Sequence, residues 1–383
     1  MSSLHRLRED PDMFAPEAEP LHLHGVVLPD DNERDLYVVD GRITSGPVDG
    51  ATTILERGFI TSGLVDVHAH LTIASPAGDA ADPRERAMAS ARLHLDAGVL
   101  AIREPGSPDE ASRQFGPDEG LPRVITAGHL LTPPDTYFPG IGRMVPEAEL
   151  PAVAEAEALA SVGWAKVIGD WPGADGLMHL NYRTATLIET ARRVHAAGGR
   201  IAIHATSPSA VEAAIEASFD SIEHGWGIRP EHFPAMVRQR TALVPTLTMT
   251  MRLLPEVEGF LASIGLGPAG IAESAADGRR HLEMTGLAHA AGIAVLAGTD
   301  AGMIPHGLIR EEIGWLRQAG LPNETALAAA SWSARQFLGL PVLAEGAAAD
   351  IVVYANDPRH NLQALDRPLL MLLAGRVLDP VVA

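Results

Sequence analysis

The chain has 383 residues, of which 46% are hydrophobic, and it carries a formal net charge of −20. This length suits a barrel of about 250 residues with a second unit, and the hydrophobic content excludes a chain that is disordered throughout. The acidic surface would repel phosphates, so no nucleic-acid partner is expected, and the absence of cysteine excludes disulfides, thiol nucleophiles and thiolate metal ligands.

Both ends of the chain predict short β-strands, preceded by a loose, charged arm over residues 1–18. Apolar runs separated by turn residues fill 19–60, and similar runs return at 349–355 and 368–378. Because the two ends share this character and the middle does not, we expect 19–60 and 340–383 to meet in a small β-sandwich domain.

The middle of the chain, residues 61–339, alternates strand-like runs with Ala-rich segments of helical length. Strands are predicted at 63–70, 98–106, 123–131, 164–170, 200–207, 221–226, 242–249 and 293–300. Helices are predicted at 83–98, 149–163, 182–199, 209–218 and 272–291, and an insertion is predicted at 252–271. Eight strands in βα order predict an α/β fold with a (β/α)8 TIM-type barrel; a doubly wound open sheet is the alternative.

Polar residues that bind metals stand where the predicted strands end, which is where barrels of this type carry their active sites. His68 and His70 end the first strand and are two residues apart, so both imidazoles point to the same side. His204, His224 and Asp300 end the fifth, sixth and eighth strands. We expect these side chains to converge on a metal site.

Lys166, on the predicted fourth strand, is the single lysine among the 29 lysine and arginine residues of the chain. An amine can lose its proton and act as a nucleophile, whereas arginine cannot. A charged amine inside a barrel is costly unless it is paired or neutral. A neutral amine can react with CO2 to form a carbamate, whose oxygens can bridge two metal ions.

Several motifs resemble those of the amidohydrolase superfamily, in its imidazolonepropionase-like and Xaa-Pro dipeptidase (prolidase)-like branch. They are GLVDVHAH at the first strand, IEHG at the sixth, AGTDAG at the eighth and the closing GAAADIVVYANDP segment at 346–358. The resemblance covers the chain from about residue 19. It implies one metal ion held by His68, His70 and Asp300, a second held by His204 and His224, and a carbamylated Lys166 that bridges them. Zinc is the expected metal, with manganese and iron as alternatives.

By this resemblance the chain would be an enzyme that cleaves an amide or peptide-like C–N bond of a small molecule. A metal-bridging hydroxide would attack the carbonyl, with Asp300 as general base and then general acid. Mononuclear deaminases of the superfamily carry a Glu soon after the fifth-strand His, but 205–208 read Ala-Thr-Ser-Pro. A mononuclear deaminase or cyclic-amide hydrolase, a metal-assisted lyase or cyclase, and a scaffold without catalysis stay as alternatives.

Contacts to the substrate are assigned on weaker grounds. The candidates are His129, Tyr137, Arg103 and His306, with Thr246 and Thr248 as lining of the pocket on the predicted seventh strand, while Glu223 is expected to be structural. Neither a signal peptide nor a membrane span is predicted, so we expect a cytoplasmic protein. The sequence leaves the oligomeric state open, a homo-oligomer included.

Overall fold

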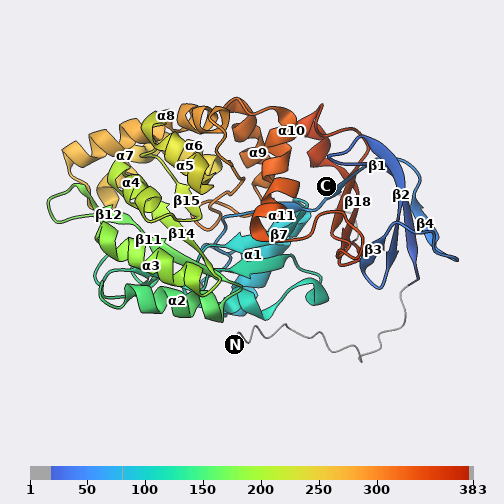
Figure 1. Cartoon of the computed structure of the whole chain (residues 1–383), viewed down its shortest axis with the longest axis horizontal. Coiled ribbons are helices and arrows are strands. Elements are labelled where there is room, and N and C mark those ends of the chain that lie inside the picture. Colours follow the sequence, from blue (N-terminus) through green and yellow to red (C-terminus); the bar gives the residue numbers. More distant parts are fainter. Residues whose placement is uncertain (1–18, 80, 379–383) are drawn as a thin grey trace.

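The computed structural model describes residues 19–79 and 81–378, so the predicted arm over 1–18 lies outside the described residues. The chain forms a larger α/β body with a small β-sheet at one end of it (Figure 1). In the described part no helix is long and apolar enough to cross a membrane.

The small sheet is built from both ends of the chain. Its order is β19-β18-β17-β5-β1-β2-β3, with β4 also paired to β1. Antiparallel pairing of β17 with β5 joins the two ends. The bounds are β1 (Leu21–Val27), β2 (Asn32–Val39), β3 (Arg42–Thr44), β4 (Thr52–Leu55), β5 (Phe59–Ser62), β17 (Ile351–Tyr354), β18 (Pro368–Leu373) and β19 (Arg376–Leu378). All eight strands are hydrogen-bonded in one sheet, so the predicted pair of packed sheets is not confirmed.

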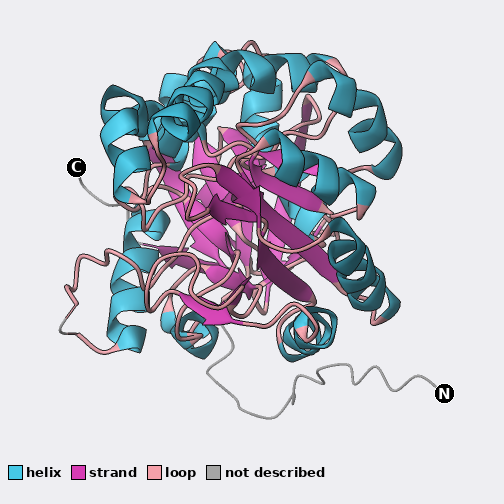
Figure 2. Cartoon of the chain, turned by 90° about the vertical axis from the view of Figure 1, so that its left-hand side faces the viewer, coloured by secondary structure: helices cyan, strands magenta, loops and turns pink. Residues whose placement is uncertain are grey.

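The body has a TIM-barrel-type α/β fold, in which helices surround parallel strands (Figure 2). One parallel sheet contains β6 (Leu64–Asp66), β7 (Val99–Glu104) and β8 (Arg123–Thr126). The other contains β10 (Gly142–Met144), β9 (Leu130–Thr132), β11 (Trp164–Ile168), β14 (Arg200–Ala205), β15 (Ser221–His224) and β16 (Ala242–Val244). A two-stranded sheet of β12 (Asp170–Pro172) and β13 (Met178–Leu180) lies apart from them.

The described strands follow the predicted order, but their hydrogen bonds do not form a continuous closed barrel. The predicted third strand, 123–131, is split, because β8 pairs with β7 whereas β9 pairs with β11. The predicted eighth strand, 293–300, is not a continuous strand. A bridge between Val295 and Leu243 joins it to β16, and bonds from Val67 N to Ala297 O and from Asp300 N to His68 O join it to the segment after β6. One buried apolar cluster nevertheless joins these elements, with members from β6, β7, β8, β11, β14, β16 and the 293–300 segment.

The predicted helices form, and several begin at residues that cap their free N–H groups. Asp82 accepts from Glu85 N at the start of α1, and Ser207 accepts from Ala210 N at the start of α4. The α-helices are α1 (Pro83–Asp96), α2 (Leu150–Ala160), α3 (Thr184–Ala196), α4 (Pro208–Glu216), α5 (Phe233–Gln239), α6 (Leu247–Leu253), α7 (Val257–Ser263), α8 (Pro268–Ala290), α9 (Ile309–Gln318), α10 (Asn323–Ala329) and α11 (Trp332–Leu338). Short 3-10 helices lie at Ala111–Gln114, Pro117–Glu119, Pro230–His232, Leu254–Glu256 and Leu362–Asp366.

The prediction of one strand over 242–249 was wrong. β16 ends at Val244, and α6 begins at Leu247. Glu312 accepts bonds from the backbone N–H groups of Leu247 and Thr248 at 3.0 and 2.6 Å, and thereby satisfies the free donors at the start of α6. Thr248 therefore lies in a helix and bonds Glu312, and the predicted insertion at 252–271 is the end of α6, all of α7 and the start of α8.

Candidate metal centre

The six predicted metal ligands line one cavity of about 270 Å³. His68 and His70 follow β6, Lys166 lies in β11, and His204 and His224 lie at the ends of β14 and β15. Asp300 is brought to them because its backbone N–H bonds His68 O at 2.8 Å. Residues from five separate segments therefore meet at the carboxyl ends of the strands, where the active sites of TIM barrels lie.

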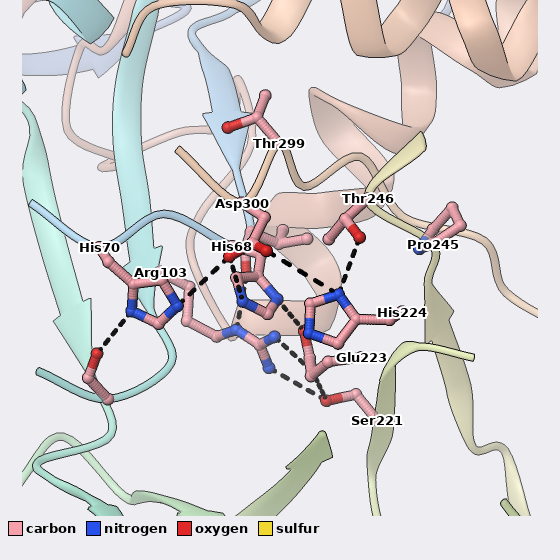
Figure 3. Close-up of polar contacts among 12 residues, drawn as sticks. His68, His70, Arg103, Ser221, Glu223, His224, Pro245, Thr246, Thr299 and Asp300 are labelled. Atoms are coloured by element: carbon pink, nitrogen blue, oxygen red, sulfur yellow. Dashed lines mark hydrogen bonds and ion pairs between the residues drawn. The ribbon is translucent and has the colours of Figure 1, made fainter. Parts of the chain in front are cut away.

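The carboxylate of Asp300 lies among the imidazole rings of His68, His70 and His224 (Figure 3). Its Oδ1 lies 3.3 Å from His68 Nε2 and 3.4 Å from His70 Nε2, and its Oδ2 lies 4.0 Å from His224 Nδ1. The rings of His204 and His224 are 4.6 Å apart between centroids. His68, His224 and Asp300 each offer a ligand atom within 4.8 Å of the others, so this donor set can hold a divalent ion.

Hydrogen bonds at Nδ1 orient three of the four histidine rings. His68 Nδ1 lies 2.6 Å from Glu223 Oε2, and His70 Nδ1 lies 2.8 Å from the carbonyl oxygen of Gly106. His224 Nδ1 bonds Thr246 Oγ1 at 2.9 Å. With a metal ion bound, Nδ1 of His68 and His70 would donate these bonds and Nε2 would present its lone pair to the ion, which is the arrangement that orients and strengthens imidazole ligands.

Glu223 and Arg103 form a buried ion pair beneath His68. Arg103 Nη2 donates to Glu223 Oε1 at 2.6 Å, Nη1 donates to Ser221 Oγ at 3.1 Å, and Nε donates to Val67 O at 2.7 Å. Burial raises the pKa of Glu223, but the charges of Arg103 and Lys166 outweigh it and hold that pKa well below its usual range. Arg103 is fully buried and is not among the residues that line the cavity, so its predicted contact with substrate is corrected to a contact with Glu223.

Substitution Glu223→Gln tests this support. The amide keeps the shape but removes the negative charge that accepts from His68 and balances Arg103. We expect metal affinity to fall about 10- to 100-fold, measured by competition with a chromophoric chelator. Loss of charge balance for the buried Arg103 is also expected to lower the midpoint of thermal unfolding. Unchanged metal affinity in a folded variant would contradict a positioning role for Glu223.

Lys166 is the unusual member of the cluster. Its side chain is 1% exposed, and its Nζ has no hydrogen-bond partner among the described residues. Burial lowers the pKa of this amine to about 8. Burial of an amine without a hydrogen-bond partner costs folding free energy. The position of Lys166 therefore favours a further group that bonds Nζ.

The other charges also suit metal binding. Burial, followed by the charge of Lys166, lowers the pKa of His204 to about 3, so its imidazole is neutral and able to act as a ligand. Burial raises the pKa of Asp300, but the charge of His68 and the bonds from His68 and His70 hold it well below its usual range. The donor set thus includes the neutral imidazole of His204, the ionised carboxylate of Asp300 and an amine without a hydrogen-bond partner among the described residues, which fits a divalent metal ion.

Close backbone approach at Gly298 fixes the position of His68. A Cβ added there would lie 2.6 Å from His68 Cβ and 2.6 Å from Val244 Cγ1. Gly298→Ala is therefore expected to lower the free energy of unfolding by about 1–3 kcal/mol and to weaken metal binding. The matched control is Gly259→Ala in α7, where an added Cβ meets nothing within 4 Å. Urea unfolding of both proteins checks this, and equal stabilities would contradict it.

The predicted substrate contacts separate into two groups. Tyr137 lines the cavity, with its ring 6.1 Å from that of His204. His129 and His306 are not among the lining residues: His129 Nδ1 bonds Glu157 Oε1 at 3.0 Å, and His306 Nε2 bonds Ile73 O at 3.1 Å. Their assignment as substrate contacts is therefore corrected to bonds within the fold.

Two buried carboxylates near the ligands were missed. Asp66 accepts from Thr299 Oγ1 at 2.6 Å and from the backbone N–H groups of His68 and Thr299, both at 3.1 Å, and so joins the first-strand and eighth-strand motifs. Asp170 accepts from Thr206 N at 2.9 Å and lies 3.5 Å from His204 Nε2. Asp66 stands two residues before His68 and so shares its side of the strand, which is a signal that could have found it.

The chain belongs to the amidohydrolase family, whose match covers residues 178–378. It is a hydrolase of the class that acts on carbon–nitrogen bonds, and this family generally binds divalent metal ions. An uncharacterized protein of Mycobacterium tuberculosis is 37% identical over 363 residues, which are 94% of this chain and 96% of that protein.

Two solved structures share the fold. A Xaa-Pro dipeptidase crystallised with methionine in its active site has a TM-score of 0.77 at 18% identity, covering 94% of this chain and 100% of that one. A putative prolidase from Bifidobacterium longum has a TM-score of 0.78 at 23% identity, covering 95% of each chain. The resemblance to the prolidase-like branch agrees with these structures.

Proposed function

We propose that the protein is a binuclear metal-dependent amidohydrolase that cleaves an amide bond of a small molecule. The observation that carries this proposal is Lys166, whose buried Nζ lacks a hydrogen-bond partner among the described residues and which lines the same cavity as four imidazoles and Asp300. A single metal ion would need only part of this donor set. The lysine has a role if its modified form is a ligand shared by two ions.

The modification of Lys166 needs CO2 alone. The lone pair of neutral Nζ forms a bond to the carbon of CO2, one C=O bond opens to an oxygen anion, and the nitrogen releases a proton to solvent water. The product carries a negative charge next to His204 and His224, where the unmodified amine would place a positive one. Replacing the protonated amine by a carbamate removes the repulsion that the amine would exert on metal ions bound beside it.

The protein residues would bind the metal ions, transfer a proton and orient the ligands. His68, His70 and Asp300 would hold one ion, His204 and His224 the other, and carbamylated Lys166 both. Zinc ions bound there would polarise the substrate carbonyl and lower the pKa of water toward neutrality. Asp300, held as a carboxylate, would accept a proton from the attacking water and deliver it to the leaving nitrogen. Glu223 would keep His68 oriented while this proton moves.

Release of an amine from small amides tests the function. We would incubate the zinc-loaded protein with aryl amides, N-acyl amino acids and dipeptides, and measure both the amine and the acid formed. The proposal expects cleavage that stops when metal is removed by a chelator and returns when zinc is added. Aminated heterocycles such as cytosine and adenine would be incubated in parallel. Release of ammonia from one of them, with no amine or acid formed from any amide, would contradict the amidohydrolase reaction and favour the deaminase.

A further inference from the structure

We propose that the substrate is an uncharged amide with a bulky aromatic or aliphatic substituent, in preference to a free dipeptide with its two terminal charges. This inference rests on the proposed function and narrows its substrate class. The contacts that support it lie in the cavity wall beyond the metal ligands.

One side of the cavity is a cluster of aromatic rings beside the metal centre. Tyr137, Phe138 and Trp171 pack edge to face, with centroid distances of 5.0 Å for Tyr137–Phe138, 4.9 Å for Tyr137–Trp171 and 5.0 Å for Phe138–Trp171. Tyr137 also contacts the ring of His204 edge-on. A group that leaves the reacting carbonyl toward this side would meet ring faces and edges, which favour flat apolar substituents.

A second part of the cavity lining is also apolar. It is formed by Trp226 after β15 and by side chains of α6 and α7 and the turn after α7, namely Met249, Leu253, Phe260, Leu261 and Ile264. The Trp226 indole N–H donates to Thr250 Oγ1 at 3.0 Å, so its polar atom is already bonded and its ring is left for apolar contact. A substrate therefore finds polar groups at the metal ligands and apolar surface around them, the usual division of roles in a small-molecule site.

Charge partners for a dipeptide are lacking among the described lining residues. Apart from the six predicted ligands, the one charged residue there is Arg252, and its guanidinium is paired with Glu311 at 3.0 and 2.6 Å. Arg103 is buried against Glu223, away from the cavity. A substrate carboxylate would lose its hydration without gaining a free cation, and an α-ammonium group would find no carboxylate except Asp300. Burying such charges unpaired is costly, so the cavity selects against them.

The reaction on this class balances with water alone. The C–N bond of the amide breaks, the oxygen of water bonds to the acyl carbon, and its protons pass to the leaving nitrogen and to solvent. The products are a carboxylic acid and an apolar amine. The acid carries a charge that the apolar wall does not stabilise, which favours its release.

A pair of substrates that differ by one charge tests the proposal. N-benzoyl-4-nitroaniline is uncharged, its 4-carboxybenzoyl counterpart differs from it only by an added carboxylate, and methionyl-proline represents the dipeptides. With zinc-loaded protein we expect kcat/KM for the uncharged amide to exceed that for either of the others at least about 100-fold. Equal or faster cleavage of the carboxylate or the dipeptide would overturn the substrate class and leave the hydrolase function standing. If protein with two ions bound cleaves none of the three substrates, both the substrate class and the proposed hydrolase function would be overturned.

Trp171 gives a second measurement. Trp171→Ala is expected to raise KM for the uncharged amide about 10- to 100-fold with little change in kcat, because ring contacts bind substrate and transition state alike. Trp171→Phe should regain most of the loss, and metal content should match the wild type in both variants. An unchanged KM in Trp171→Ala would contradict the role of the aromatic wall.

Discussion

Lys166→Arg is expected to reduce kcat by at least about 10³-fold, because a ligand shared by two metal ions is lost. Arginine preserves a cation of similar length, but it keeps its proton and cannot form a carbamate. The wild-type amine is buried and has no hydrogen-bond partner among the described residues, so the bulkier guanidinium would also bring an uncompensated charge among the imidazoles. Steady-state hydrolysis of the uncharged aryl amide measures the effect.

The single lysine makes this prediction sharper. Because the chain has no other ε-amine, protein equilibrated with ¹³C-bicarbonate should give one side-chain carbamate resonance, which is absent in Lys166→Arg. In Lys166→Ala the space left by the side chain could admit a short carboxylate, so added acetate or formate is expected to restore part of the activity. Hydrolysis at the wild-type rate by Lys166→Arg would rule out the bridging role.

Asp300→Asn should lower kcat about 10²- to 10⁴-fold, the range for loss of a general acid–base group. The amide has nearly the same shape, so the change removes the proton acceptor with little effect on packing. It also weakens a ligand that lies 3.3 and 3.4 Å from His68 and His70, and metal content must therefore be measured beside the rate. We expect the rate to remain low even when metal is supplied in excess.

The control for Asp300→Asn is Asp220→Asn. Asp220 directly precedes β15, at the opposite end of that strand from His224, and accepts from Ile201 N at 2.7 Å. Its loss should affect stability while kcat changes less than about twofold, as for a surface substitution away from the site. Equal losses of kcat in the two variants would indicate a general effect on the fold and would contradict a proton-transfer role for Asp300.

The sequence predicted the main parallel strands of the body and helices α1 to α4 and α8 in their order, because these apolar runs are followed by Ala-rich segments of helical length with a clear end, whereas no ranges were predicted for α5 to α7 or α9 to α11. It also predicted which side chains line the cavity at the ends of strands, since βα order alone places those ends together. It failed at 242–249, where a run of alternating threonines looks like a strand. Glu312, more than sixty residues away, supplies the acceptor that lets α6 start at Leu247.

The supporting residues could be predicted only in part. Ser221 and Glu223 are two apart on β15 and both contact Arg103, so alternation along the strand would have turned Glu223 toward the interior. His224 follows with a φ of +66°, and Asp300 has a φ of +59°. These left-handed residues turn the chain after each strand, and a local pattern does not predict such strained positions because the surrounding fold holds them.

Elemental analysis of metal per chain, on protein purified without chelators, tests the central claim most directly. The wild type should contain two divalent ions per chain, with zinc expected, and Lys166→Arg should contain one or fewer while it remains folded. One ion per chain in both proteins would contradict the binuclear, carbamate-bridged centre.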